Sequence, residues 1–295
     1  MNITALIVTY NRLNKLKKTI QATLALPFKS VIIVDNASTD GTMEWLRTNC
    51  DKRLIVLSCN ENTGGAGGFK YGSEWIVNNI ETDWVLFYDD DAYPQADFFE
   101  RIQVESLTEK TVYACNVIDT HGTRCGMNIP WKKYPSSILD NIKYLVKSNS
   151  FIADGTKNDQ IISVSFVGML ISKINLEKYY HFIDESLFIY FDDVYFSYHL
   201  HMNDIKMEYL MNLSVIHDVS QNTGYMAHWK VYYLIRNMML SKHIFGSRRP
   251  FSNVYIFLRL IKYSVKALKH PEKKEYTKSL VRGVYDGICN HKWKR

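Results

Sequence analysis

The first third of the chain alternates continuous apolar runs with amphipathic stretches. The apolar runs have the length of strands and cover residues 3–9, 30–35, 53–58 and 83–88. The stretches between them have helical spacing and cover residues 12–25, 39–49 and 68–78. Strands that are apolar throughout and alternate with helices are typical of βαβ units, in which helices cover both faces of a parallel sheet. The pattern therefore predicts an α/β fold with a mainly parallel, Rossmann-like sheet flanked by helices.

Polar or glycine-rich segments follow each of the four predicted strands. They are residues 10–12 (YNR), 35–42 (DNASTDGT), 60–69 (NENTGGAGGF) and 89–91 (DDD). Ligands of parallel α/β sheets bind at the carboxyl ends of the strands. We therefore expect one rim of the sheet to carry the chemistry of this protein.

Three consecutive aspartates, Asp89, Asp90 and Asp91, end the fourth predicted strand. Like charges this close raise one another's pKa unless a cation compensates them. Two carboxylates at a fraying strand end can turn toward one ion, and oxygen ligands suit Mg²⁺ or Mn²⁺. The alternative is an acidic surface turn, but the apolar run directly before the aspartates favours a metal site.

Four of the five residues 64–68 are glycines, and a helix is predicted to start near Phe69. Glycine permits positive φ and close backbone approach, and a helix N-terminus offers free N–H groups to an anion. The segment is not a Walker A loop and matches GxGxxG poorly. It predicts a loop that passes close to a phosphate, with a flexible turn as the alternative.

Asp35 and Asn36 suit a nucleobase or ribose, whereas residues 38–40 favour helix capping.

A second acidic cluster, Asp192 and Asp193, ends the aromatic run that begins at residue 188. A carboxylate in such a place can act as a general base on a hydroxyl, and a helix N-cap is the alternative.

Residues 206–216 alternate as a strand does, and His217 follows them. A lone histidine is usually structural, but its position after a strand in a chain with a predicted metal site favours a ligand.

The C-terminal region is basic and amphipathic. Residues 242–295 contain 14 Lys and Arg against 3 Asp and Glu, whereas residues 1–241 contain 22 against 27. One helical face over 254–268 is apolar: Val254, Phe257, Leu258, Ile261, Val265 and Leu268. A second stripe is cationic: Arg259, Lys262, Lys266 and Lys269. Such a helix can lie in a membrane interface. The alternative is a helix packed on the body of the protein with its basic edge in water.

The composition is that of an ordinary globular protein. The 295 residues, 46% hydrophobic and 22% charged, exclude a disordered chain and can bury a large core. No apolar run reaches the length of a membrane span, and the N-terminus runs into a strand without a basic leader. The five cysteines are scattered without a CxxC pair, which argues against a disulfide framework or a zinc site. We therefore expect a cytoplasmic protein.

Four segments carry a family resemblance. VTYNR (8–12), VDNASTDGT (34–42), NTGGAGG (62–68) and YDDDAYP (88–94) occur in an order and spacing that resemble the inverting glycosyltransferases of family 2, which have the GT-A fold. FIYFDD (188–193), the histidine after the next strand and the segment Tyr232-Tyr233-x-x-Arg236-Asn237 resemble the C-terminal half of that family. The glycine segment is most similar to bacterial galactofuranosyltransferases, since related rhamnosyltransferases tend to carry a bulkier residue at Gly65.

The resemblance implies a role for each motif residue. It implies contacts to a nucleotide-sugar for Thr9, Tyr10, Arg12, Asp35, Asn36, Asn62, Gly64, Gly65, Gly67, Gly68, Asp89 and Asp90. It implies that Asp89, Asp91 and His217 ligate Mn²⁺ or Mg²⁺. It also implies that Asp193 is the catalytic base and that Asp192 orients hydroxyl groups. The family often has Glu-Asp at this place, so Asp192-Asp193 leaves open which carboxylate reaches the acceptor.

The implied activity is metal-dependent transfer of a sugar, with inversion, from a nucleotide-sugar to a hydroxyl of a lipid-linked or cell-surface glycan. UDP-galactofuranose is the expected donor, and dTDP-rhamnose is the alternative. The basic region 253–295 predicts peripheral attachment to an anionic membrane surface, on the inner face of the cell membrane. A nucleic-acid-binding module that uses the basic tail is the alternative of another class. The acidic body and the lack of a known nucleic-acid-binding motif argue against it.

The expected domain organisation follows from these assignments. Residues 1–245 would form the GT-A domain, with a nucleotide-sugar-binding half at 1–118 and an acceptor and catalytic-base half at 119–245. Residues 246–295 would add a basic, amphipathic helical extension. A sugar-phosphate nucleotidyltransferase would share such a sheet, but it needs a glycine-rich basic signature that residues 1–25 lack.

Overall fold

The computed structural model describes residues 1–219 and 225–291. The strands are β1 (Ile3–Thr9), β2 (Ser30–Asp35), β3 (Leu54–Ser58), β4 (Trp84–Asp89), β5 (Ala92–Pro94), β6 (Thr111–Ile118), β7 (Asp159–Gln160), β8 (Met169–Ser172) and β9 (Lys206–His217). The α-helices are α1 (Leu13–Leu24), α2 (Thr42–Arg47), α3 (Gly64–Asn79), α4 (Phe98–Ile102), α5 (Ile138–Val146), α6 (Lys173–Tyr179), α7 (Asp192–Met202), α8 (His228–Phe245), α9 (Asn253–Lys269) and α10 (Lys273–Ile288).

One mixed sheet forms the centre of the molecule. The strand order is β3-β2-β1-β4-β8-β6-β9-β5, and β7 pairs with β9. The first four strands of this order are parallel, β8 is antiparallel to both of its neighbours, and β9 is parallel to β6. The prediction of an α/β fold with a helix-flanked sheet is confirmed, and the parallel part is the one built from the first four predicted strands.

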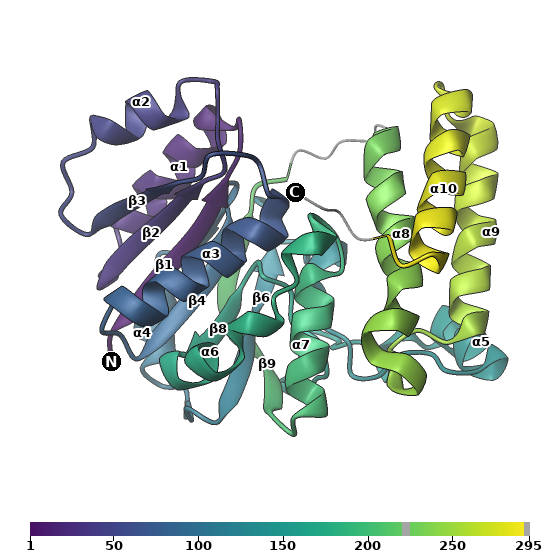
Figure 1. The fold of residues 1–295 in the computed structure, drawn as a ribbon. Coiled ribbons are helices and arrows are strands. Elements are labelled where there is room, and N and C mark those ends of the chain that lie inside the picture. The colour runs from purple at the N-terminus through teal and green to yellow at the C-terminus, as the bar shows by residue number, and fades with distance from the viewer. Residues whose placement is uncertain (220–224, 292–295) are drawn as a thin grey trace.

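Alternate residues of each buried strand face opposite layers of helices. Ile3 and Ile7 of β1 belong to the core under α1, α2 and α4. Leu6 and Val8 belong to the core under α3, α6 and α7. Because side chains of a strand alternate between its faces, a strand covered on both sides must be apolar throughout. Figure 1 shows α3, α6 and α7 together on one face of the sheet.

Two predicted helices differ from the observed ones at their starts. α3 begins at Gly64 and not near Phe69, so residues 64–68 are helical and not a loop. α2 begins only at Thr42, because the Asp40 side chain accepts hydrogen bonds from the N–H of Thr42 and from the N–H of Leu13. Asp40 thus hydrogen-bonds the first residue of each of two helices, but it is the N-cap residue of neither, because Arg12 and Gly41 hold those positions.

The helices α8, α9 and α10 form a separate layer beside the sheet (Figure 1). A third apolar cluster holds it together, and residues such as Leu187 and Tyr195 from the α7 region extend that cluster toward the sheet. The domain boundary expected at residue 245 falls between α8 and α9, although α8 packs on α10 within this layer. None of the helices in the described residues is both long and apolar enough to span a bilayer.

The predicted apolar stripe of α9 points away from the protein. Tyr255, Ile256 and Tyr263 are buried, whereas side chains of the stripe such as Phe257 and Leu268 are 62% and 71% exposed. The stripe and the packing face are therefore different sides of the helix. The helix therefore packs on the rest of the protein, as the alternative predicted, but through a face other than the predicted stripe.

Candidate active site

The carboxyl end of β4 brings three aspartates to the rim of the sheet. Asp89 is the last residue of β4, and the buried Asp90 and Asp91 form the turn into β5. Arg12, from the loop after β1, places Nη1 3.1 Å from Asp90 Oδ1 and Nη2 2.8 Å from Asp91 Oδ2. Thr9 Oγ1 donates to Asp90 Oδ2 at 2.9 Å. In this structure Thr9 and Arg12 thus hold the aspartate turn.

His217 approaches the same turn from β9. It is the last residue of that strand, not the residue after it, and it pairs with Ala92 of β5. Its Nε2 lies 3.2 Å from Asp91 Oδ1. One ligand atom from each of Asp89, Asp91 and His217 lies within 4.8 Å of the others. The structure therefore gathers the three residues that the sequence suggested as metal ligands.

Asn128, which sequence reasoning missed, orients this histidine. Its Oδ1 lies 2.9 Å from Nδ1 of His217, and its Nδ2 donates to Ser165 Oγ at 2.9 Å. An amide oxygen only accepts hydrogen bonds, so Nδ1 carries a proton and Nε2 is the ring nitrogen that faces Asp91. Asn128 belongs to no recognisable motif, so no sequence signal pointed to it.

The buried carboxylates of this turn have too little positive charge around them. Burial and the charge of Asp91 raise the pKa of Asp89, and burial raises the pKa of Asp90 to about 6 although Arg12 opposes it. At Asp91, His217 and Arg12 outweigh the effect of burial, so its pKa is lowered. Asp91 Oδ1 nevertheless accepts no hydrogen bond from any described residue. A divalent cation on Asp89, Asp91 and His217 fits this arrangement, because it would compensate the charge and bind the facing lone pairs.

The glycine-rich segment forms the first turns of α3. Gly64 has a φ of +72°, and a Cβ atom on it would overlap the carbonyl oxygen of Phe188, so this position requires glycine. Gly65 is different, because the nearest atom to an added Cβ would be Asp192 Oδ2, at the ordinary contact distance of 3.8 Å. The start of α3 therefore lies directly beside the second acidic pair.

Asn36 and Asn62 shape the glycine segment from within. Asn36 Nδ2 donates to the carbonyl oxygen of Gly64 at 2.7 Å, and Asn36 Oδ1 accepts from the N–H of Thr63 at 3.2 Å. Asn62 Oδ1 accepts from the N–H of Gly64 at 2.8 Å. In this structure both side chains thus hydrogen-bond the backbone of Thr63 and Gly64, where α3 begins.

The remaining residues that the resemblance singled out lie along the same rim. Asp35 is buried at the end of β2 and accepts from the N–H of Ser38 at 3.2 Å, whereas the Tyr10 side chain is exposed. Gly67 and Gly68 face inward, where an added Cβ would overlap Thr63 or Val8.

A cavity of about 520 Å³ lies beside the end of β3. Its lining includes Ser58, Asn60, Glu61 and Lys70.

Asp192 and Asp193 are the first two residues of α7. The residues before them adopt unusual backbone conformations, since Phe188, Tyr190 and Phe191 have φ of +66°, +67° and +66°. Residues with side chains rarely adopt this left-handed region, and such strain persists only where the surroundings impose it. The segment that presents the two carboxylates is therefore held in place by other parts of the fold.

Arg236 and Asn237 of α8 hold that strained segment. Asn237 Nδ2 lies 2.9 Å, 2.8 Å and 2.8 Å from the carbonyl oxygens of Leu187, Ile189 and Tyr190. The fully buried Arg236 donates from Nη2 to the carbonyl oxygen of Leu187 at 3.1 Å. The Arg-Asn pair noted in the sequence therefore positions Asp192 and Asp193 from a distant helix.

The two carboxylates face different surroundings. Asp192 lies toward Gly65 and Asp89, and burial together with the neighbouring negative charges raises its pKa well above the usual range. Asp193 accepts from the N–H of Val194 at 2.7 Å and from the side chain of Ser165. Burial raises the pKa of Asp193 against these hydrogen bonds. Asp192 is therefore on the side of the glycine segment, and Asp193 is on the side of Ser165.

The fold matches solved glycosyltransferase structures. GalNAc-T7, solved with UDP, GalNAc and Mn²⁺, superposes with a TM-score of 0.60 at 10% identity, over 99% of this chain and 58% of that one. TarS of S. aureus superposes with a TM-score of 0.55 at 17% identity, over 99% of this chain and 49% of that one. The chain thus spans about half the length of these two structures. At this identity they show the fold alone.

The fold is therefore of the GT-A type. The chain belongs to glycosyl transferase family 2, whose profile matches residues 4–179. No curated protein matches it. The matched region contains β1 to β4, the aspartate turn and the glycine segment, so the first four motifs of the resemblance lie inside it. Asp192, Asp193, His217 and the segment 232–237 lie outside it.

Proposed function

We propose that this protein transfers a sugar, with inversion and with a divalent metal, from a nucleotide-sugar to a hydroxyl of a lipid-linked or cell-surface glycan. The observation that carries this proposal is the meeting of two acidic groups. Asp89, Asp91 and His217 form one group at the end of β4, and Asp192 reaches toward Asp89 and Gly65 from the other. GalNAc-T7, which shares the fold, binds UDP and Mn²⁺.

We propose UDP-galactofuranose as the donor and dTDP-rhamnose as the alternative. The open space at Gly65 supports this choice, because a bulkier residue there would occupy the side that faces Asp192. The nucleoside would contact Tyr10 and Asp35 at the rim. A divalent cation on Asp89, Asp91 and His217 would neutralise the diphosphate of the departing nucleotide. An imidazole among the ligands favours Mn²⁺ over Mg²⁺, which prefers oxygen alone.

Asp193 is the proposed catalytic base. It accepts the proton of an acceptor hydroxyl, whose oxygen forms a bond to the anomeric carbon as the bond from that carbon to the diphosphate breaks. The attack comes from the face opposite the leaving group, so the configuration inverts. Its raised pKa makes Asp193 a stronger base than an ordinary carboxylate. Asp192, beside Gly65, would orient hydroxyls of the donor sugar.

The replacement Asp193→Asn tests this mechanism. We expect transfer to fall about a hundredfold or more, with Mn²⁺-dependent binding of the nucleotide unchanged. The measurement is release of nucleoside diphosphate from UDP-galactofuranose, dTDP-rhamnose, UDP-galactose and UDP-glucose, with calorimetry of UDP binding. Asp204→Asn is the matched control, since Asp204 is exposed at the other end of α7 and its φ of 58° suits Asn. Full activity of Asp193→Asn would refute the assignment of the base.

We also propose that the C-terminal region attaches the protein to an anionic membrane, on the inner face of the cell membrane. The exposed stripe of α9 supports this, because residues 253–269 contain no acidic side chain and carry Arg259, Lys262, Lys266 and Lys269. Residues 292–295 of the predicted membrane region 253–295 lie outside the described residues. Ile261→Glu should abolish co-sedimentation with phosphatidylglycerol vesicles and leave turnover of a water-soluble acceptor unchanged. Equal sedimentation of the variant and the original protein would contradict this.

A further inference from the structure

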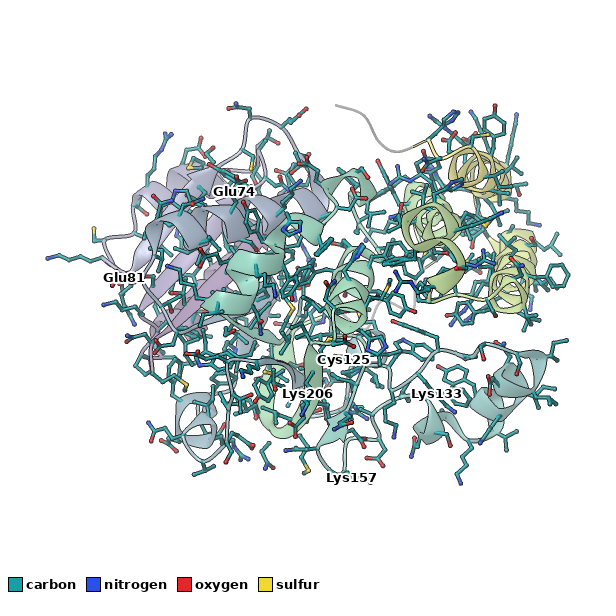
Figure 2. The ribbon with its side chains drawn as sticks, turned by 60° about the horizontal axis from the view of Figure 1, so that its bottom comes forward. Glu74, Glu81, Cys125, Lys133, Lys157 and Lys206 are labelled. Carbon is teal, nitrogen blue, oxygen red and sulfur yellow. The ribbon has the colours of Figure 1, made fainter. Side chains whose placement is uncertain are left out.

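A second cavity, of about 400 Å³, lies between the segment that follows β6 and the helices α8 and α9. Five aromatic side chains and one arginine dominate its wall: Trp131, Tyr144, Phe191, Tyr255, Tyr263 and Arg259. In Figure 2 the segment that carries Cys125 and Lys133 runs from beside the sheet toward α5. Parts of the chain that are far apart in sequence therefore enclose this cavity.

The cavity adjoins both halves of the candidate active site. Phe191 in its wall directly precedes the acidic pair at the start of α7. Met127 and Ile129, also in its wall, flank Asn128, which hydrogen-bonds the metal-ligand candidate His217. The cavity wall is therefore adjacent in sequence both to the acidic pair and to the residue that orients His217.

Trp131 in the cavity wall packs against neighbouring aromatic rings. The ring of Trp131 lies 5.2 Å from that of Tyr144 and 5.3 Å from that of Tyr134. Such rigid rings present flat apolar faces together with polar edges, and the C–H faces of sugar rings stack on them while hydroxyls bind the edges. The cavity therefore suits a carbohydrate better than a purely apolar ligand.

Arg259 adds a positive charge to this wall. Its guanidinium lies 4.9 Å from the centre of the Tyr255 ring, and among the described residues it forms no ion pair with a carboxylate. A half-buried guanidinium without an acidic partner can bind the oxygens of a phosphate in a bidentate manner. The charge of the cavity thus matches an anionic group attached to the sugar.

The two helices at the edge of the cavity expose apolar side chains. Tyr144 belongs to α5 and Arg259 belongs to α9, and these helices adjoin (Figure 1). On α5, Leu145 and Val146 are 83% and 85% exposed, and on α9 Phe257 and Leu268 of the stripe are also exposed. Apolar side chains on both helices next to a phosphate-binding arginine suit a lipid chain.

We propose that this cavity binds the acceptor as a glycan joined through a phosphate or diphosphate to a lipid. The glycan lies among the aromatic rings with its free end toward Asp193, the phosphate contacts Arg259, and the lipid lies along α5 and α9. This rests on the proposed function. It adds to that function an acceptor site, an anchor for the phosphate and a second helix, α5, that contacts the lipid.

The test uses the full chain loaded with UDP and Mn²⁺, so that the nucleotide site is filled. The probes are N-acetylglucosamine and galactose, each joined through a diphosphate to an undecyl chain, and the matching undecyl glycosides without the diphosphate. We expect the diphosphates to bind about tenfold more tightly than the glycosides, and Arg259→Gln to remove that difference. Lys269→Gln is the control, since it removes the same charge from α9 but lies outside this cavity.

Three outcomes would overturn the proposal while UDP and Mn²⁺ still bind. These are no binding of the diphosphates, equal binding of charged and uncharged probes, or equal effects of Arg259→Gln and Lys269→Gln. Tyr144→Ala, on the half-exposed face of α5, should also weaken the binding of all four probes. This second variant tests the proposal if Arg259→Gln does not fold. If UDP and Mn²⁺ themselves fail to bind, the proposed function fails, and the two failures are thereby distinguished.

Discussion

Nδ1 of His217 lies 2.9 Å from Oδ1 of Asn128, a residue 89 positions earlier in the chain. This single hydrogen bond connects the segment after β6 to the end of β9 and decides which imidazole nitrogen faces Asp91. Ser165 receives a hydrogen bond from Asn128 and itself hydrogen-bonds Asp193. The group that would hold the metal and the proposed base are therefore joined through two uncharged side chains.

Replacing Asn128 separates these two connections. Asn128→Ala should weaken Mn²⁺ binding about tenfold or more, because the imidazole loses the partner that fixes its proton. Asn128→Asp keeps an acceptor for His217 but no longer donates to Ser165, so Mn²⁺ binding should persist while kcat falls. Ser165→Ala should behave as Asn128→Asp does. Titration with Mn²⁺ followed by electron paramagnetic resonance, together with kcat and KM, checks this, and equal Mn²⁺ affinity in Asn128→Ala would contradict it.

The aspartate turn should make the metal-free protein less stable as the pH rises. Asp90 has its pKa raised from 3.8 to about 6, and that of Asp89 is also raised. The folded protein therefore keeps protons that the unfolded chain releases, so the free energy of unfolding falls between about pH 4 and about pH 6. Asp90 alone accounts for at most about 3 kcal/mol of this loss.

Urea unfolding in EDTA across this pH range measures that loss, and Mn²⁺ should restore stability at the upper end by binding the ionised carboxylates. Asp90→Asn should flatten the pH dependence. If stability in EDTA rises steadily between about pH 4 and about pH 6, the electrostatic account of the turn is wrong.

Asn237→Ala should uncouple α8 from the segment before α7. The carbonyl groups of Leu187, Ile189 and Tyr190 would lose the donor that they share, and the left-handed conformations before Asp192 would lose support. We expect kcat to fall at least about tenfold and the unfolding free energy to fall by about 1–3 kcal/mol. Asn203→Ala is the control, because Asn203 is exposed and donates only within α7. An unchanged kcat would show that the segment holds its own conformation.

Adjacent glycines should respond differently to alanine. Gly64→Ala would overlap the carbonyl oxygen of Phe188 at a positive φ, so it should destabilise the fold and shift the acidic pair. Gly65→Ala has room, so the melting temperature should change little while KM for the donor rises. Thermal unfolding and donor kinetics of the two variants test the contrast. Equal melting temperatures for both would exclude the close packing of Gly64 against Phe188.

Much of the sheet could be predicted because its strands are local patterns. The runs that became β1, β2 and β4 are mostly apolar, since both faces of the sheet are covered, and polar residues mark where each run ends. The glycine segment was predicted as a loop because glycine disfavours helices. Close contact with Phe188 and Val8 outweighed that preference, and α3 starts there.

The sequence by itself determined the strand ends that carry Asp35 and the three aspartates, together with the apolar stripe of α9, because these depend on residues close together in the chain. Tertiary structure alone decided that Asn128 orients His217, that Asn237 holds the segment before Asp192, and that the α9 stripe faces outward. The two hydrogen bonds join residues that are 89 and 47 positions apart, and the direction of the stripe depends on how α9 packs on α8 and α10. A hydrogen bond between single residues so far apart leaves no periodicity in the sequence.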